Sequence, residues 1–304
     1  MLTTFKVGQA SPANTFFAIW MADAAGLYEK NGLKMEIVPV VGGKNTGPDL
    51  ASGKIDLMHI GMSSVVRANS MGGAAVTIGS LSNIIRNTMF GAPGINTAAD
   101  LKGKTVGISS AGSETDPTTT LALRRIGLSR DDVIVKEIGT VRLNAVRNGE
   151  VAASLMGEPT RSQAYALGLT ALVDLFVDRT PWLYSGLVVH RNFLRDHRDR
   201  VKQFLKATVE GNYLAVADAT AAKKLMAKEL EISDPAILDI AYENFRSSTP
   251  LDAEVTLEGA KNIIDIVAGP GASRDPKDYL DTGPHDELAA EGFYKAMRTK
   301  YAVG

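Results

Sequence analysis

The chain has 304 residues, of which 45% are hydrophobic and 22% charged, and its formal net charge is -1. This length supports two hydrophobic cores, and the dispersed Lys and Arg residues exclude a basic block of the kind that binds nucleic acid. The chain contains no Cys, which excludes disulfides, Cys-ligated metals and thiol catalysis. Its apolar runs are too short to span a bilayer, and the N-terminal MLTTFKVG lacks the pattern of an export signal.

The first part of the chain alternates predicted strands and helices. The strands are TFKVGQ, LKMEIVPVV, KIDLMHI and AVTIGSL, and the helices between them cover residues 15–28, 48–51 and 65–70. Strands and helices that alternate across short connections predict a parallel sheet with right-handed crossovers.

The second part repeats this order. The helix AADLKG is followed by KTVGISS, the helix PTTTLALRRIGL, DVIVKEI, the helix VRLNAVRNG and the strand EVAASLM. The stretch LASGKIDLMHIGMSS is thus echoed by AVRNGEVAASLMGEP, with Gly53 matching Gly149. We expect both glycines to end a helix in the left-handed conformation, and we expect two similar lobes.

The rest of the chain predicts a return to the first lobe and then a helical tail. RNTMFGAP and YSGLVVH are the two candidate crossings between the lobes, so they predict a two-strand hinge beside a cleft. From about Asn192 the pattern is helical, with Asp234 as an N-cap before Pro235. The predicted fold class is α/β, with lobe one formed by residues 1–88 and 188–304 and lobe two by residues 89–187.

Ligands of open parallel sheets bind beyond the carboxyl ends of the strands. The loops predicted there are rich in Gly, Ser, Thr and Asn, which suits recognition by hydrogen bonding. Together with aromatic residues near the crossings, they give the predicted ligand-binding set: Gln9, Ser11, Phe16, Gly43, Ser63, Ser64, Asn83, Ser110, Ser113, Glu114, Thr115, Glu158, Trp182 and Tyr184.

The charge that this set prefers stays open. Asp116 is expected as the N-cap of a helix with Pro117 in its first turn, and that helix N-terminus could hold an anion unless Asp116 satisfies its N–H groups itself. Glu114, Asp116 and Glu158 would form an acidic rim, which favours an amine or a neutral ring. Glu158 could equally be a solvated carboxylate, with Pro159 starting the next helix.

The aromatic members of the set also have two interpretations. Trp182 and Tyr184 could stack on a flat ligand or pack at the hinge, and at least one of Phe16 and Phe17 should be core. Enzyme motifs are absent: there is no G-x-S-x-G, Walker loop or H-E-x-x-H. The four His residues are interpreted as surface or packing residues, so no metal or cofactor is expected.

The ordered stretches AGLYEKNGLKMEIVPVVGG, LASGKIDLMHIG, LKGKTVGISSAGS, NGEVAASLMGEP and LVVHRNFLRDHRDRVKQFLKA carry a family resemblance. The chain resembles the solute-binding proteins of ABC importers of the nitrate, sulfonate and taurine type, which include binders of the thiamine pyrimidine precursor. The family often has Asp in the pattern G-x-v-D-A. Here lobe one keeps Asp56 but lobe two has Ala152, so this Asp is expected to have a structural role.

The resemblance implies a type II periplasmic-binding fold, a ligand held between hinged lobes, and docking on a permease and ATPase complex. It implies a monomeric, periplasmic or anchored protein whose export signal has been removed. The expected ligand is a sulfonate or carboxylate anion, or alternatively a pyrimidine-like or amine-bearing ring. A related synthase uses Cys and His to bind iron, and because this chain has no Cys, we expect binding rather than catalysis. An enzyme of this fold would need Glu114 or Glu158 as its base.

Overall fold

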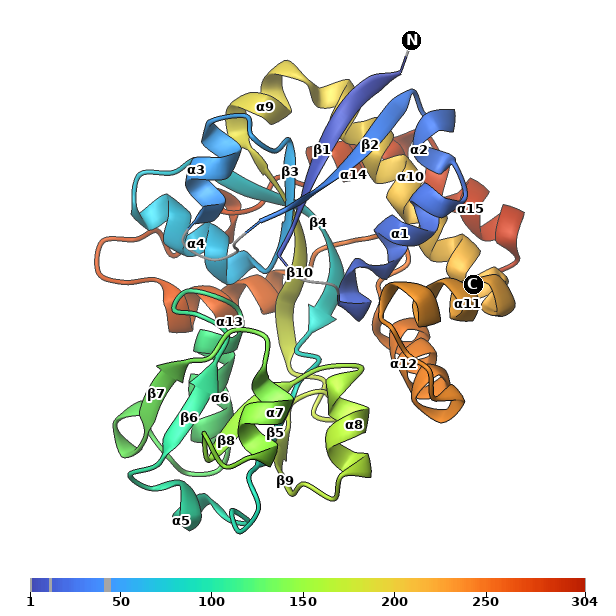
Figure 1. The fold of residues 1–304 in the computed structure, drawn as a ribbon. Coiled ribbons are helices and arrows are strands. Elements are labelled where there is room, and N and C mark those ends of the chain that lie inside the picture. Colours follow the sequence, from blue (N-terminus) through green and yellow to red (C-terminus); the bar gives the residue numbers. More distant parts are fainter. Residues whose placement is uncertain (1, 11–12, 41–44, 304) are drawn as a thin grey trace. The chain divides into compact units, whose positions relative to one another are not determined.

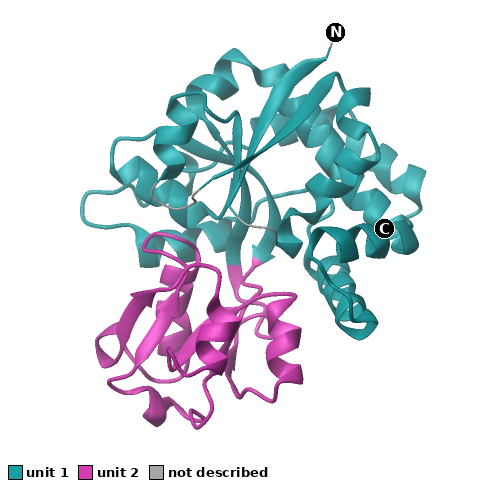
Figure 2. Cartoon of the chain, in the orientation of Figure 1, with its two compact units in different colours: residues 1–83, 182–304 teal, residues 84–181 magenta. Residues whose placement is uncertain are grey.

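The structure is a computed structural model that describes residues 2–10, 13–40 and 45–303, and Figure 1 shows its helices and strands. The chain divides into two compact units (Figure 2). Unit 1 consists of residues 1–83 and 182–304, and unit 2 of residues 84–181.

Unit 1 is built on a five-stranded sheet in the order β2-β1-β3-β10-β4. Its strands are β1 (Thr3–Gln9), β2 (Leu33–Pro39), β3 (Leu57–Ile60), β4 (Ala75–Ile84) and β10 (Pro181–His190). β1 runs parallel to β2 and β3, whereas β10 is antiparallel to β3. The predicted parallel arrangement is confirmed for β1, β2 and β3, whereas β10, which was predicted only as a crossing between the lobes, joins the sheet in the opposite direction.

Helices lie on both sides of this sheet (Figure 1). Those before β10 are η1 (Asn14–Phe16), α1 (Phe17–Ala24), α2 (Leu27–Lys30), α3 (Thr46–Ala51) and α4 (Met62–Ser70). The single helix predicted over residues 15–28 is interrupted, because Gly26 adopts a left-handed φ of 66° between α1 and α2.

The C-terminal part of unit 1 is helical, as predicted. It contains α9 (Arg191–Asp196), α10 (Arg198–Ala217), α11 (Ala219–Glu229), α12 (Pro235–Ser248), α13 (Leu257–Val267), η4 (Pro276–Asp278), α14 (Gly283–Ala290) and α15 (Phe293–Tyr301). The expected cap of α12 is confirmed, since Asp234 Oδ1 accepts a 2.8 Å hydrogen bond from the Ala236 N–H.

Unit 2 has a second five-stranded sheet, in the order β7-β6-β8-β5-β9. Its strands are β5 (Thr88–Gly91), β6 (Thr105–Ile108), β7 (Ile134–Glu137), β8 (Ala153–Met156) and β9 (Ala171–Asp174). β6 is parallel to β7 and β8, and β5 is antiparallel to β8 and β9. Strand β9 was not predicted, and β5 lies in the segment that was predicted only as a crossing.

Short helices connect the strands of unit 2: α5 (Ala98–Leu101), α6 (Thr115–Arg125), η3 (Arg130–Asp132), α7 (Arg142–Arg147) and α8 (Thr160–Ala166). Each unit has its own core. Phe5, Phe17 and Phe204 are fully buried in the core of unit 1, and Phe90 and Met156 in that of unit 2. Burial of such side chains is the main favourable contribution to folding.

The predicted internal echo is present in the backbone. Gly53 and Gly149 have φ values of 70° and 71°, and they are followed by β3 in unit 1 and by β8 in unit 2. Three residues after each glycine, the Asp56 N–H donates to the Lys6 carbonyl and the Ala152 N–H to the Thr105 carbonyl. The two units therefore share one local design.

The edge of β4 is covered by segments from the C-terminal region. The Ser80 N–H donates to the Ala253 carbonyl, the Thr77 N–H donates to the Tyr279 carbonyl, and the Thr77 carbonyl accepts from the Asp281 N–H. These bonds satisfy backbone groups that an edge strand would otherwise expose.

Candidate functional site

The carboxyl end of β6 is the best-defined part of the predicted site. The chain leaves β6 at Ile108, forms a polar turn over residues 109–114 and enters α6 at Thr115. Because β6 and β8 are parallel neighbours, their carboxyl ends lie at the same edge of the sheet. This edge carries loops of unit 2 that the sequence assigned to ligand binding.

Hydroxyl groups organise the turn after β6. Thr115 Oγ1 accepts a 2.8 Å hydrogen bond from the Ser109 N–H and lies 2.9 Å from Ser113 Oγ. Ser113 Oγ also donates to the Ser110 carbonyl at 2.7 Å. Ser110, Ser113 and Thr115 are therefore brought together, in a turn held by its own side chains.

A guanidinium group reaches the same turn from the next loop. Arg142, the first residue of α7, donates through Nη1 to Ser109 Oγ. Its side chain is partly buried. Sequence reasoning missed Arg142, although its position directly after the predicted loop Gly139-Thr140 was an available signal.

Asp116 does not cap α6 as predicted. Glu114 is the N-cap residue, and Asp116 lies within the first turn. Asp116 Oδ2 accepts from the Gly112 N–H at 2.8 Å, while Oδ1 forms a 2.6 Å ion pair with Arg130 Nη2. Because Asp116 accepts a hydrogen bond from the preceding turn and does not cap the helix, α6 begins at Thr115, before the predicted start at Pro117.

Glu158 lies in the loop after β8 and is engaged within unit 2. Its Oε1 lies 3.3 Å from Arg161 Nη1, and its Oε2 accepts from the Ser162 N–H at 3.2 Å. The side chain is only 4% exposed, so the structure does not show the solvated carboxylate considered as the alternative. Pro159 is the N-cap of α8, which begins one residue later at Thr160.

Arg161 is the centre of a buried charge cluster. Its Nη2 lies 2.7 Å from Asp174 Oδ2, its Nε donates to Thr88 Oγ1 at 2.8 Å, and the guanidinium lies over the rings of Tyr165 and Phe176. Burial is the largest single influence and would raise the pKa of Asp174, but the hydrogen bonds from Arg161 and from the Val177 N–H, together with the Arg161 charge, outweigh burial and lower that pKa. The cluster therefore holds Asp174 as a carboxylate.

At the corresponding edge of unit 1, the described residues include a histidine with hydrogen-bonding contacts. Gln9 and His59 are paired across β1 and β3 at their carboxyl ends. His59 Nε2 lies 3.1 Å from the Thr15 carbonyl and contacts Ser185 Oγ. Since a carbonyl only accepts, this contact places hydrogen on Nε2. Sequence analysis interpreted His59 as a surface or packing residue and gave no signal for this contact.

The other predicted residues of unit 1 occupy different environments. Ser63 and Ser64 are buried in the first turn of α4. Asn83 Nδ2 donates to the Glu254 carbonyl at 2.8 Å, which joins β4 to the C-terminal region. Ser11 and Gly43 lie outside the described residues.

The predicted aromatic contacts of unit 1 are mainly core packing. Phe16 is 0% exposed and packs its ring edge-on against His59, with centroids 5.0 Å apart. Phe17 is also fully buried. Trp182 is 0% exposed, whereas Tyr184 is only partly buried. Of the two residues, Tyr184 retains more surface that a ligand could contact.

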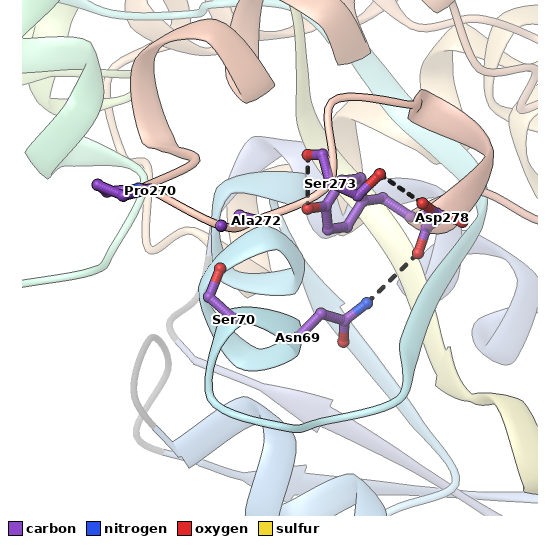
Figure 3. Close-up of a pocket in the computed structure, with 8 residues that line it drawn as sticks. Asn69, Ser70, Pro270, Ala272, Ser273 and Asp278 are labelled. Atoms are coloured by element: carbon purple, nitrogen blue, oxygen red, sulfur yellow. Dashed lines mark hydrogen bonds between the residues drawn. The ribbon is translucent and has the colours of Figure 1, made fainter.

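A pocket of about 320 Å³ lies elsewhere in unit 1, between the end of α4 and residues 270–279 (Figure 3). Asn69 Nδ2 donates to the Ala75 carbonyl at 2.9 Å, and Ser273 Oγ donates to Asp278 Oδ2. Because α4 starts after the carboxyl end of β3 and ends before β4, the pocket is at the opposite edge from the ligand loops. We assign it no part in the site.

Among the described residues, no group of three or more His, Asp or Glu side chains is arranged to hold a metal ion. None of the helices in the described ranges combines the length and apolar character needed to cross a membrane.

Two curated relatives match parts of the chain. A Schizosaccharomyces pombe protein named 4-amino-5-hydroxymethyl-2-methylpyrimidine phosphate synthase is 25% identical over 207 residues, which is 62% of this chain and 58% of that protein. The riboflavin-binding protein RibY of Chloroflexus aurantiacus is 30% identical over 115 residues, which is 37% of this chain and 32% of that protein. The matches thus span less than two thirds of either relative.

Solved structures match over much more of the chain. A Bordetella bronchiseptica protein has a TM-score of 0.80 at 18% identity, covering 95% of this chain and 98% of that one. The periplasmic aliphatic sulphonate binding protein SsuA of Escherichia coli has a TM-score of 0.67 at 22% identity, covering 82% and 86%. The fold is therefore the type II periplasmic-binding-protein fold, as the sequence predicted.

A family model described as NMT1/THI5 like matches residues 13–222, which is more than half of the 304 residues. The chain belongs to the NMT1/THI5-like family.

Proposed function

We propose that this protein is the solute-binding component of an ABC import system, and that it captures a small organic anion, a sulfonate or a carboxylate. The observation that carries the proposal is the meeting of Arg142 with the hydroxyl-rich turn after β6, at the N-terminal end of α6. Hydroxyls, helix N–H groups and a guanidinium are the donors that recognise sulfonate and carboxylate oxygens.

The nearby carboxylates do not oppose an anion as the sequence suggested. Asp116 is paired with Arg130 at 2.6 Å and Glu158 with Arg161 at 3.3 Å. Asp116 is thus paired within unit 2, and Glu158 shares the Arg161 guanidinium with Asp174, which weakens the acidic-rim argument for an amine. The name of SsuA as a sulphonate-binding protein supports the same ligand class.

Several further properties belong to this proposal. The protein would act outside the cytoplasm as a monomer and would deliver its ligand to a permease and ATPase complex. A pyrimidine-like ring is the second ligand class, and the riboflavin-binding relative favours it.

The first experiment combines mass spectrometry of co-purified small molecules with calorimetric titration of alkanesulfonates and alkanoates. Arg142→Ala should weaken anion binding by about tenfold or more, as expected for a lost charged hydrogen bond. Ser113→Ala should weaken binding less and leave the fold intact. The control is Arg195→Ala, which alters an exposed ion pair with Asp196. Equal affinity in all variants, or a neutral amine-bearing ligand, would contradict the anion site.

An enzymatic role is the competing function, because one relative is named a synthase. Glu114 or Glu158 would have to act as the base, and both carboxylate oxygens of Glu158 already have partners in Arg161 and Ser162. Incubation of the protein with its co-purified ligand decides between the roles. Recovery of unchanged ligand supports binding, and time-dependent conversion supports catalysis.

A further inference from the structure

Asn87 stands at the ligand edge of unit 2 but was not predicted as a site residue. It directly precedes β5, whose register with β8 pairs Thr88 with Met156. Asn87 therefore lies opposite Gly157, where β8 ends. Its backbone position is fixed, because its carbonyl accepts from the Leu175 N–H at 3.1 Å.

The side chain of Asn87 is 3% exposed, and its Oδ1 has no hydrogen-bond partner among the described residues. The Oδ1 atoms of two other buried residues, Asn14 and Asn212, are also without a partner there, but each of these side chains donates through Nδ2. Asn14 donates to the Ala241 carbonyl at 2.8 Å, and Asn212 to the Pro250 carbonyl at 3.3 Å. Buried amides are almost always hydrogen-bonded, so the Asn87 amide calls for a partner from outside the protein.

A glycine and a paired guanidinium lie near Asn87. A Cβ atom at Gly157 would lie 3.3 Å from the Arg86 carbonyl oxygen and 3.4 Å from Asn87 Nδ2, so a side chain at position 157 would crowd both groups. Arg161 bonds Thr88, Glu158 and Asp174.

We propose that Asn87 is a ligand-recognition residue whose amide pairs with a donor–acceptor group, such as a carboxamide, on the far end of the ligand. This inference rests on the proposed function, in which Ser109 and Arg142 hold the anionic end. In the sheet order, β8 separates β6 from β5, and two strand spacings amount to roughly 10 Å. The ligand is then an elongated molecule with an anion at one end and an amide-like group about 10 Å away.

The experiment compares octanoate with suberic acid monoamide, which has the same chain length and adds a terminal carboxamide. We expect calorimetry to show at least about tenfold tighter binding of the monoamide by the unaltered chain, the effect of a paired hydrogen bond. Asn87→Ala should abolish this preference and leave octanoate binding within about twofold. The control Asn96→Ala alters an exposed amide of unit 2 and should keep the preference.

Three results would overturn the inference. They are equal affinity for both acids in the unaltered chain, a preference that survives Asn87→Ala, and a fall in thermal stability in that variant without loss of preference. The first of these leaves the proposed function standing if Arg142→Ala still weakens octanoate binding. If neither acid binds, both the inference and the anion-binding function fail.

Discussion

The carboxyl edges of the two sheets have the same topology but different chemistry. In unit 1 the described part of the edge carries His59, which lies between the Thr15 carbonyl and Ser185. In unit 2 the edge carries guanidinium groups, with Arg142 on a serine turn and Arg161 in a buried ion cluster. The comparison shows that the strand order is repeated while the side chains that face the loops have diverged. The chemical difference between the two units therefore lies in the loops and not in the strand order.

The variant expected to have the largest effect removes Arg161, the centre of the buried ion cluster in unit 2. Arg161→Ala leaves Glu158 and Asp174 buried without their cation, and we expect it to cost about 3–5 kcal/mol of unfolding free energy. Urea unfolding measures this cost, and the exposed variant Arg195→Ala serves as the control. A loss of unfolding free energy below about 1 kcal/mol would show that the ion cluster does not stabilise the carboxyl edge of the unit 2 sheet.

The same variant has a defined pH signature. The folded pKa of Asp174 is lowered from 3.8, so the stability from this carboxylate is present above its unfolded pKa and is lost as the pH falls through the lower folded pKa. Arg161→Ala should reduce the part of the acid-dependent stability loss that comes from Asp174. An unchanged pH dependence would contradict the assigned ion pair.

A second test addresses what the two units share. Gly53→Ala and Gly149→Ala each place a side chain at a φ near 70°, which should cost about 1–2 kcal/mol in both units. Gly269→Ala is the matched control, because a Cβ there meets no atom within 4 Å. Unequal costs at the two repeated positions, measured by urea unfolding, would break the proposed equivalence.

The smallest effect concerns the third residue after each glycine. Asp56 Oδ2 accepts a 2.8 Å bond from the Lys6 N–H, and Ala152 has no side-chain group to do the same. We expect Asp56→Ala to cost about 1 kcal/mol and Ala152→Asp to be neutral or slightly stabilising. A clear loss of thermal stability in Ala152→Asp would show that the units have diverged here in backbone geometry as well.

Local signals in the sequence predicted the parts of the fold that depend on neighbouring residues. The left-handed glycines at 53 and 149 and the cap at Asp234 are examples, since each effect acts within a few positions. The antiparallel directions of β5 and β10 were missed because strand direction depends on how the chain enters each sheet. The hydrophobic pattern of a strand does not indicate the direction in which the strand enters its sheet.

The candidate site was predictable only in part, for the same reason. The serine turn after β6 was recognised because its hydroxyls are contiguous in sequence. The pairs Asp116–Arg130 and Ser109–Arg142 join residues 14 and 33 positions apart, and such partners are set by strand order. No sequence feature indicated a role for Asn87. That role is inferred from the lack of a hydrogen-bond partner for its Oδ1 among the described residues.

The division of the chain also has a consequence for biosynthesis. All strands of unit 2 lie between Thr88 and Asp174, whereas the sheet of unit 1 needs β10 and is covered along β4 by residues near 253 and 280. As the ribosome releases the chain from its N-terminus, the inserted unit receives its full set of strands first. The sheet of unit 1 is therefore completed last, although the N-terminal strands of unit 1 are the first to be translated.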